Sequence, residues 1–268
     1  MNLLIIGGSD AGISAGLRAK ELAPETNVTM ILADRYPNFS ICGLPFYLSG
    51  EIADWRTLAH RTLNDIEREG IAVVSDTRAT AVDPDLKRVI VTDAAGNGRE
   101  MSYDKLVIAT GAVSTRPAVP GMDLPGVFLL RWMDDSFSFH RHLAERGPKS
   151  IVIIGAGYIG MEMADAMTRR GLSVTVVEYL PSVLTTLDSV LGAAVRDELV
   201  KNGVRVHTGV AVEEIVRRGD VLTVKGPDGF EASADMVRIR PYSAVRDHLQ
   251  QATGHRFFHH EHTGDGRR

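Results

Sequence analysis

The sequence predicts an α/β protein with two Rossmann-like nucleotide-binding domains and a small antiparallel β-meander. An apolar strand runs into a glycine turn and a helix at "NLLIIGGSDAG" (2–12), and the same order recurs at "SIVIIGAGYIG" (150–160). Each helix is followed by another apolar strand, at 28–32 and at 173–179. Continuous apolar strands that alternate with helices are typical of parallel sheets buried on both faces.

The segments between and after these two strand–turn–helix units predict smaller elements. Residues 54–70 form an amphipathic pattern, which predicts one helix with Asp54 as N-cap and Gly70 beyond its end. The proline-rich stretch 115–126 predicts a linker. The remaining elements are an antiparallel meander at 77–83, 88–92 and 98–102, a buried strand entering a glycine turn at 105–112, a helix at 188–202, and strands at 204–208, 210–217 and 220–225.

The composition excludes several classes of protein. With 44% apolar residues, 24% charged residues and a net charge of -4, the chain is globular and shows no basic face for nucleic acid. Its single cysteine, Cys42, excludes an internal disulfide and favours a reducing compartment. The start "MNLLIIGG" lacks the basic region of a signal peptide, and no apolar run approaches the roughly 20 residues of a membrane span. We therefore expect a cytoplasmic protein without membrane or nucleic-acid partners.

The second glycine turn fits the dinucleotide-binding pattern G-x-G-x-x-G at Gly155, Gly157 and Gly160. The first glycine makes the tight bend, the second lets the backbone approach a pyrophosphate, and the third allows the helix to pack closely. Glu178 ends the next strand, where a carboxylate binds ribose hydroxyls and repels a 2′-phosphate. No arginine or lysine follows closely, so the pattern favours NADH over NADPH. The alternative is a tight turn without a ligand.

The first turn is less regular. Gly7 and Gly12 hold the outer positions around Gly8, but Ser9 replaces the middle glycine. The usual acidic position holds Leu32, and Asp34 lies two residues later on the same side of an extended strand. Asp34 is thus the candidate for the ribose, and the alternative is a solvated loop residue.

With "YDKLVIATGA" (103–112) and "SICGLPFYLSGE" (40–51) added, the chain resembles the pyridine nucleotide–disulfide oxidoreductases. The resemblance covers residues 1–237 and is strongest to the single-cysteine branch: coenzyme A disulfide reductases, NADH oxidases and NADH peroxidases. It implies an FAD-binding domain at 1–118 and an NAD(P)-binding domain at 119–237. The FAD contacts that it implies are Gly7, Gly8, Ser9, Gly12, Asp34, Thr110 and Gly111.

The resemblance also implies an active site. Cys42 falls where this branch keeps its redox cysteine, Tyr158 matches the aromatic that gates the nicotinamide pocket, and Glu162 matches the acid beside that pocket. Hydride would pass from NADH through FAD to Cys42. Since a lone cysteine forms no internal disulfide, it would cycle through a mixed disulfide or a sulfenic acid. The cycle through a mixed disulfide would reduce a small disulfide such as coenzyme A disulfide. The alternatives are an NADH oxidase that reduces oxygen, a non-catalytic nucleotide-binding fragment, and a Cys42 that is merely a buried structural residue.

The chain also departs from the family pattern. Asp10 stands where the peroxidases have histidine, and Ile41 stands where coenzyme A reductases often have asparagine, so the electron acceptor stays open. The tail 238–268 loses the strand pattern and is expected to be poorly ordered, and its five histidines between 248 and 262 predict no metal site. The resemblance further implies that the C-terminal interface domain, which builds the family's homodimer, is missing. We therefore expect this chain to be truncated and to show little turnover alone.

Overall fold

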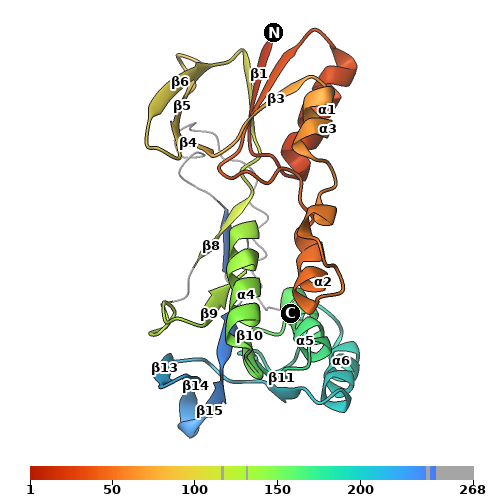
Figure 1. The fold of residues 1–268 in the computed structure, drawn as a ribbon, viewed down its shortest axis with the longest axis vertical. Helices are drawn as coiled ribbons and strands as arrows, with labels where there is room; N and C mark the ends of the chain where they lie inside the picture. Colours follow the sequence, from red (N-terminus) through yellow and green to blue (C-terminus); the bar gives the residue numbers. More distant parts are fainter. Residues whose placement is uncertain (116–117, 131, 240–241, 246–268) are drawn as a thin grey trace, which may run out of the picture. The chain divides into compact units, whose positions relative to one another are not determined.

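The computed structural model describes residues 1–115, 118–130, 132–239 and 242–245 (Figure 1). The chain divides into two compact units. The first is built mainly from Met1–Phe39 and His60–Val113, and the second from Ser40–Ala59 and Ser114–Ser243. The segment that carries Cys42 thus packs within the second unit. The predicted domain boundaries at 118 and 237 divide the chain in sequence order, so they place residues 40–59 in the first domain. The excursion of these residues into the second unit is therefore not part of the prediction.

The first unit is centred on a parallel sheet in the order β3-β2-β1-β7. Its strands are β1 (Asn2–Ile6), β2 (Asn27–Ile31), β3 (Ile71–Val74) and β7 (Lys105–Ile108). Helix α1 (Asp10–Leu22) supplies the crossover from β1 to β2 that parallel strands require. Ile5 and Met30 of the sheet pack with Ile13 of α1 in one core cluster, whereas Leu4 and Ile6 belong to a second cluster. Both faces of the sheet are therefore buried, as the continuous apolar strands predict.

An antiparallel meander packs in the second core cluster together with Leu4 and Ile6 of the parallel sheet. It consists of β4 (Thr77–Asp83), β5 (Arg88–Asp93) and β6 (Gly98–Ser102). Val89 and Val91 of β5 are buried, but Ile90 between them is exposed. This alternation is typical of a sheet with one wet face, and it confirms the predicted meander.

The second unit repeats the architecture with a parallel sheet in the order β12-β11-β10-β16-β9. Its strands are β9 (Val127–Leu129), β10 (Ser150–Ile154), β11 (Ser173–Val177), β12 (Arg205–His207) and β16 (Met236–Ile239). Helices α4 (Met133–Arg146) and α5 (Tyr158–Arg169) pack against its strands. Helix α6 (Ser189–Lys201) follows, with Asp188 as its N-cap.

A three-stranded antiparallel sheet contributes the other half of this core. It contains β13 (Glu214–Arg218), β14 (Val221–Lys225) and β15 (Glu231–Ala234). Leu222 and Val224 of β14 pack in one cluster with Val152 and Val237 of the parallel sheet. The predicted fold class, two Rossmann-like units with an antiparallel meander, is confirmed. Among the described residues, no helix is long and apolar enough to cross a membrane.

The predicted single helix at 54–70 is wrong. The structure has a short 3₁₀ helix, η2 (Trp55–Leu58), and then a separate helix α3 (Leu63–Arg68). Ala59 between them is extended, and the N–H of His60 donates to the carbonyl of Asn38. Thr62 and Asp65 form a capping box that begins α3 anew. Local capping and a bond to a distant loop therefore outweigh the helical periodicity.

The end of the described chain is more regular than its sequence indicates. Strand β17 (Tyr242–Val245) pairs with β8 (Ala112–Thr115), although residues 242–245 fall in the predicted tail without strands. The histidine-rich residues 248–262 lie outside the described residues. The short elements that complete the chain are η1 (Ile41–Gly43), α2 (Leu44–Ser49) and η3 (Pro227–Gly229).

Candidate functional site

The first glycine turn lies at the carboxyl end of β1, where the chain is too crowded for side chains. Gly7 has φ +115°, and a Cβ there would meet the carbonyl oxygen of Ala109 at 2.1 Å. A Cβ on Gly12 would meet the carbonyl oxygen of Gly7 at 1.9 Å. Both positions therefore demand glycine, and α1 begins directly against the turn. The first N–H groups of α1 have no partners within the helix, which suits a phosphate.

The neighbouring strand ends bring the other predicted residues to the same edge of the sheet. Leu32 is 3% exposed and belongs to the apolar core, which excludes it from binding ribose. Asp34 is half-buried, and its Oδ1 accepts the N–H of Tyr36 at 2.9 Å. Thr110 and Gly111 follow β7, the strand beside β1. All the predicted FAD contacts thus follow or flank the carboxyl ends of β1, β2 and β7. They are Gly7, Gly8, Ser9, Gly12, Asp34, Thr110 and Gly111.

Asn38, which was not among the site residues predicted from the sequence, closes over this turn. Its N–H donates to the carbonyl of Gly8 at 2.9 Å, and its Nδ2 donates to Asp10 Oδ1 at 3.0 Å. The residue is 3% exposed with φ +53°, and its Oδ1 is buried without a hydrogen-bond partner among the described residues. Asparagine tolerates the left-handed conformation and favours turns, which is the only signal that the sequence carried.

The second glycine turn has the same crowded geometry in the second unit. Gly155 has φ +100°, and a Cβ on Gly160 would meet the Gly155 carbonyl oxygen at 2.0 Å. Glu178 is only 9% exposed. Its Oε2 accepts the N–H of Ala156 inside the turn, and its Oε1 accepts the N–H of Leu180 at 2.9 Å. The carboxylate is thus fixed beside the turn, as a ribose ligand must be.

Tyr158 and Glu162 lie one turn apart on α5, which starts at this glycine turn. Tyr158 is 57% exposed, and its hydroxyl lies 3.2 Å from Thr186 Oγ1. Glu162 is also exposed. Because residues four apart share a helix face, both are available on one side of α5.

Cys42 sits in the 3₁₀ turn η1, immediately before α2. It is exposed, which excludes the alternative of a buried structural cysteine. Gly43 approaches the side chain of Leu58 so closely that a Cβ would lie 2.5 Å from Leu58 Cδ2. Ile41 and Phe46 on either side of Cys42 are 54% and 50% exposed. The thiol therefore lies on the surface of the second unit with apolar neighbours, on a segment whose backbone is held close to η2.

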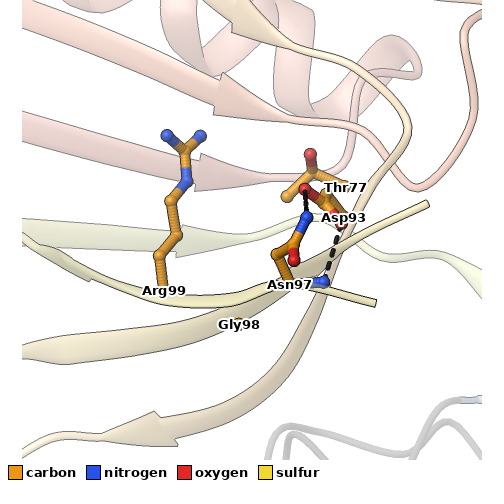
Figure 2. Close-up of a pocket in the computed structure, with 5 residues that line it drawn as sticks. All are labelled: Thr77, Asp93, Asn97, Gly98 and Arg99. Atoms are coloured by element: carbon orange, nitrogen blue, oxygen red, sulfur yellow. Dashed lines mark hydrogen bonds between the residues drawn. The ribbon is translucent and has the colours of Figure 1, made fainter. Parts of the chain in front are cut away.

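The hollow in Figure 2 lies elsewhere, in the antiparallel meander of the first unit. Asn97 donates its backbone N–H and its Nδ2 to the carboxylate of Asp93. These bonds lower the pKa of Asp93. The carboxylate holds the turn between β5 and β6, and no predicted site residue lines this hollow, so it is a feature of the turn rather than the nucleotide site.

Comparison with known proteins decides the family. Residues 1–249 match the family described as pyridine nucleotide-disulphide oxidoreductase. The chain belongs to this family. Membership implies FAD and a nicotinamide nucleotide as cofactors, and the crowded glycine turns of both units fit nucleotides.

The relatives include NADH oxidases and sulfur reductases, as well as a rubredoxin-NAD(+) reductase from Acinetobacter baylyi that is 30% identical over 88% of this chain and 60% of its own length. An NADH oxidase from Methanocaldococcus jannaschii is 34% identical over 94% of this chain and 56% of its own length. An NAD(P)H sulfur oxidoreductase (CoA-dependent) from Pyrococcus furiosus is 33% identical over 88% of this chain and 53% of its own. The structure of an NAD-dependent persulfide reductase from A. fulgidus superposes with a TM-score of 0.89 at 31% identity, over 95% of this chain and 48% of that one. The chain thus spans about half the length of the relatives it matches.

Proposed function

We propose that this chain carries the nucleotide-binding and redox-cysteine parts of an enzyme that uses NADH and FAD to reduce a small disulfide, with coenzyme A disulfide as the first candidate. The exposure of Cys42 on the second unit carries the proposal, since a thiol that attacks a substrate must be accessible. The sulfur oxidoreductase and persulfide reductase among the relatives support a sulfur compound as acceptor.

The first unit would hold FAD. The bend at Gly7 and the close packing of Gly12 against it present the start of α1 to the pyrophosphate, Gly8 and Ser9 line the turn, and Asp34 accepts ribose hydroxyls. Thr110 and Gly111 flank the same edge after β7. When bound, FAD supplies a two-electron relay between the nicotinamide and Cys42. The carboxylate of Asp10 accepts a hydrogen bond from Asn38 Nδ2, so this negatively charged group has a partner within the protein.

The second unit would hold NADH. Gly155, Gly157 and Gly160 admit the pyrophosphate to the N-terminus of α5, while Glu178 accepts the ribose hydroxyls. Each oxygen of a carboxylate has two acceptor positions, so Glu178 can keep Ala156 and still bind ribose. Its negative charge would repel the 2′-phosphate of NADPH. Tyr158 and Glu162 face the solvent beside the turn, where they would guide the nicotinamide half.

The cysteine chemistry balances in two steps. The Cys42 thiolate attacks a disulfide RSSR, forms Cys42–S–S–R and releases the thiolate RS⁻. NADH then supplies two electrons and one hydrogen, which yields the Cys42 thiolate, RSH and NAD⁺. The exposed side chains of Ile41 and Phe46 precede and follow Cys42 in the chain and could provide apolar contacts for the approaching disulfide.

Reduction of oxygen is the second candidate, and the NADH oxidase among the relatives favours it. In that reaction, hydrogen peroxide formed from oxygen and NADH oxidises the thiolate to Cys42–SOH with release of hydroxide. A second NADH returns the sulfenic acid to thiolate and water. A chain that only binds nucleotides is the third candidate.

The intact mass of the chain shows what is attached to its single thiol, and this mass separates the candidates. We would load the chain with FAD, add coenzyme A disulfide and record the intact mass. We expect a coenzyme A adduct on Cys42 that NADH removes, and no adduct on Cys42→Ser, which still binds both nucleotides. An adduct that persists in NADH would contradict the reductase. A dimedone adduct that forms with NADH and oxygen would favour the oxidase, and a chain that retains no flavin would favour the binding fragment.

A further inference from the structure

The helix that follows Cys42 is too short to hold its position alone. Helix α2 has six residues, and isolated helices below about 12 residues are marginal in water. It begins at Leu44, two residues after Cys42, so a movement of α2 is a movement of the thiol. Leu48 of α2 is fully buried, and α2 packs against α4 and α5 (Figure 1). Its contacts with these two helices therefore contribute, together with η2, to the position of Cys42 on the second unit.

The C-terminal end of α2 receives a bond from a distant arginine. Within the segment, the N–H of Gly50 donates to Tyr47, and the N–H of Ile52 donates to Phe46. The carbonyl of Leu48 instead accepts Nη1 of Arg170 at 2.7 Å, across 122 residues of sequence. A guanidinium at a helix C-terminus satisfies a carbonyl and complements the helix dipole. Gly50 ends α2 in the left-handed conformation with φ +91°.

Arg170 is itself fixed by the nucleotide-binding helix. It is the C-cap residue of α5, and its N–H donates to the carbonyl of Ala166. The N-cap residue at the other end of α5 is Gly157 of the second glycine turn. One helix of 12 residues, roughly 18 Å long, thus carries the nucleotide turn at its start and the anchor of α2 at its end.

Neighbouring aromatic groups restrict the same junction. The rings of Tyr47 on α2 and His140 on α4 stack with their centroids 4.7 Å apart. Burial, and then the positive charge of Arg170, lower the pKa of His140. The lowered pKa reduces the fraction of His140 that carries a positive charge near this guanidinium. The Tyr47–His140 stack therefore packs α2 against α4, while Arg170 bonds the Leu48 carbonyl.

We propose that Arg170 is a positioning residue for Cys42: it anchors the C-terminal end of α2 to α5, and so ties the thiol to the helix that begins at the NADH turn. The inference rests on the proposed function for the redox role of the thiol and for NADH as the ligand of the glycine turn. The anchoring itself is a property of the chain, which is measurable without turnover.

Arg169 offers a matched control. It has the same side chain on the neighbouring residue, and it bonds Asp165 on its own helix at 2.9 Å. Its contact with the segment after α2 is an exposed ion pair, with 3.8 Å between Arg169 Nε and Glu51 Oε1. Exposed pairs of this kind stabilise little. Arg170→Met and Arg169→Met therefore remove the same group from adjacent residues, but only the first removes the bond to α2.

The test measures amide hydrogen exchange and the alkylation of Cys42 by iodoacetamide. In Arg170→Met we expect the amides of residues 44 and 46–50 (residue 45 is proline) to exchange about tenfold faster, and the alkylation rate to change at least threefold, with exchange in β10 and affinity for NAD⁺ unchanged. A tenfold effect corresponds to about 1.4 kcal/mol, as expected for one charge-assisted hydrogen bond. Arg169→Met should stay within twofold, and Arg170→Lys should restore part of the protection because it keeps a cationic donor.

Three results would overturn the inference: equal behaviour of Arg170→Met and Arg169→Met, faster exchange throughout the second unit, or no rescue by lysine. If Arg170→Met does not fold, Arg170→Lys alone must show an intermediate exchange rate confined to amides 44–50. Failure of Cys42 to form a mixed disulfide would refute the proposed function, yet it would leave these exchange rates as a valid measure of the anchor.

Discussion

The two glycine turns have nearly the same backbone although their sequences differ. Gly7 and Gly155 have φ +115° and +100°, and a Cβ on the third glycine would strike the first carbonyl at 1.9 Å in one turn and 2.0 Å in the other. At the middle position, Ser9 has φ −95° and ψ −169°, and Gly157 has φ −80° and ψ −175°. The outer glycines thus set the turn, and the middle position adopts an extended conformation open to any residue.

The acids beside the turns are where the two units differ. Glu178 is buried, and one of its oxygens accepts an N–H from inside its glycine turn. Asp34 is half-buried and accepts from Tyr36 in its own loop. Removing the two carboxylates should therefore weaken nucleotide binding to different extents. The comparison teaches that turn geometry is encoded by two glycines, whereas the placement of the acid depends on the surrounding fold.

The largest expected effect comes from the third glycine of either turn. Gly160→Ala should lower NADH affinity about 100-fold, and Gly12→Ala should do the same for FAD, because backbone must move to admit the Cβ. Isothermal titration measures both affinities. Gly171→Ala is the control, since Gly171 has φ +86° with nothing within 4 Å of a Cβ. It should cost about 1 kcal/mol of stability and leave NADH affinity unchanged. Equal losses in Gly160→Ala and Gly171→Ala would show that strain, not crowding, governs the turn.

Removal of the acids should give an intermediate and unequal effect. Glu178→Ala should weaken NADH and reduce its preference over NADPH, which we expect to be roughly 5- to 150-fold from like-charge repulsion of about 1–3 kcal/mol. Asp34→Ala should weaken FAD by only about threefold, because a half-exposed carboxylate is better solvated. Titrations with NADH, NADPH and FAD measure the three affinities. An unchanged NADH to NADPH ratio in Glu178→Ala would remove this residue from the ribose site.

The smallest expected effect is at the middle position. Ser9→Gly should change FAD affinity less than about twofold, because Ser9 already has the backbone conformation of Gly157. Gly157→Ser should weaken NADH more, since its added side chain lies where the backbone approaches the pyrophosphate. A tenfold gain in FAD affinity for Ser9→Gly would mean that the hydroxymethyl group obstructs the first turn.

The sequence predicted the parts of this fold that depend on local patterns. The apolar strands, the glycine turns and the meander follow from periodicity and glycine spacing, and the structure contains them. The roles of individual site residues stay predictions, except that the exposure of Cys42 excludes a buried structural role. Helix α4 was not predicted, and the break at Ala59 follows from a bond between distant residues, His60 and Asn38. Packing of residues 40–59 with the second unit has the same non-local origin.

The excursion of residues 40–59 also has a consequence for biosynthesis. Leu48 is synthesised 122 residues before Arg170, the partner of its carbonyl, and at about 5–20 residues per second this separation lasts roughly 6–24 seconds. For most of that interval Tyr47 and Leu48 lack α4, and α5 is completed only at its end. The second unit can complete its packing only after its last helices are made, so the emerging chain must keep this apolar segment from associating elsewhere. The segment that places the thiol therefore gains its final contacts only after α5 has been synthesised.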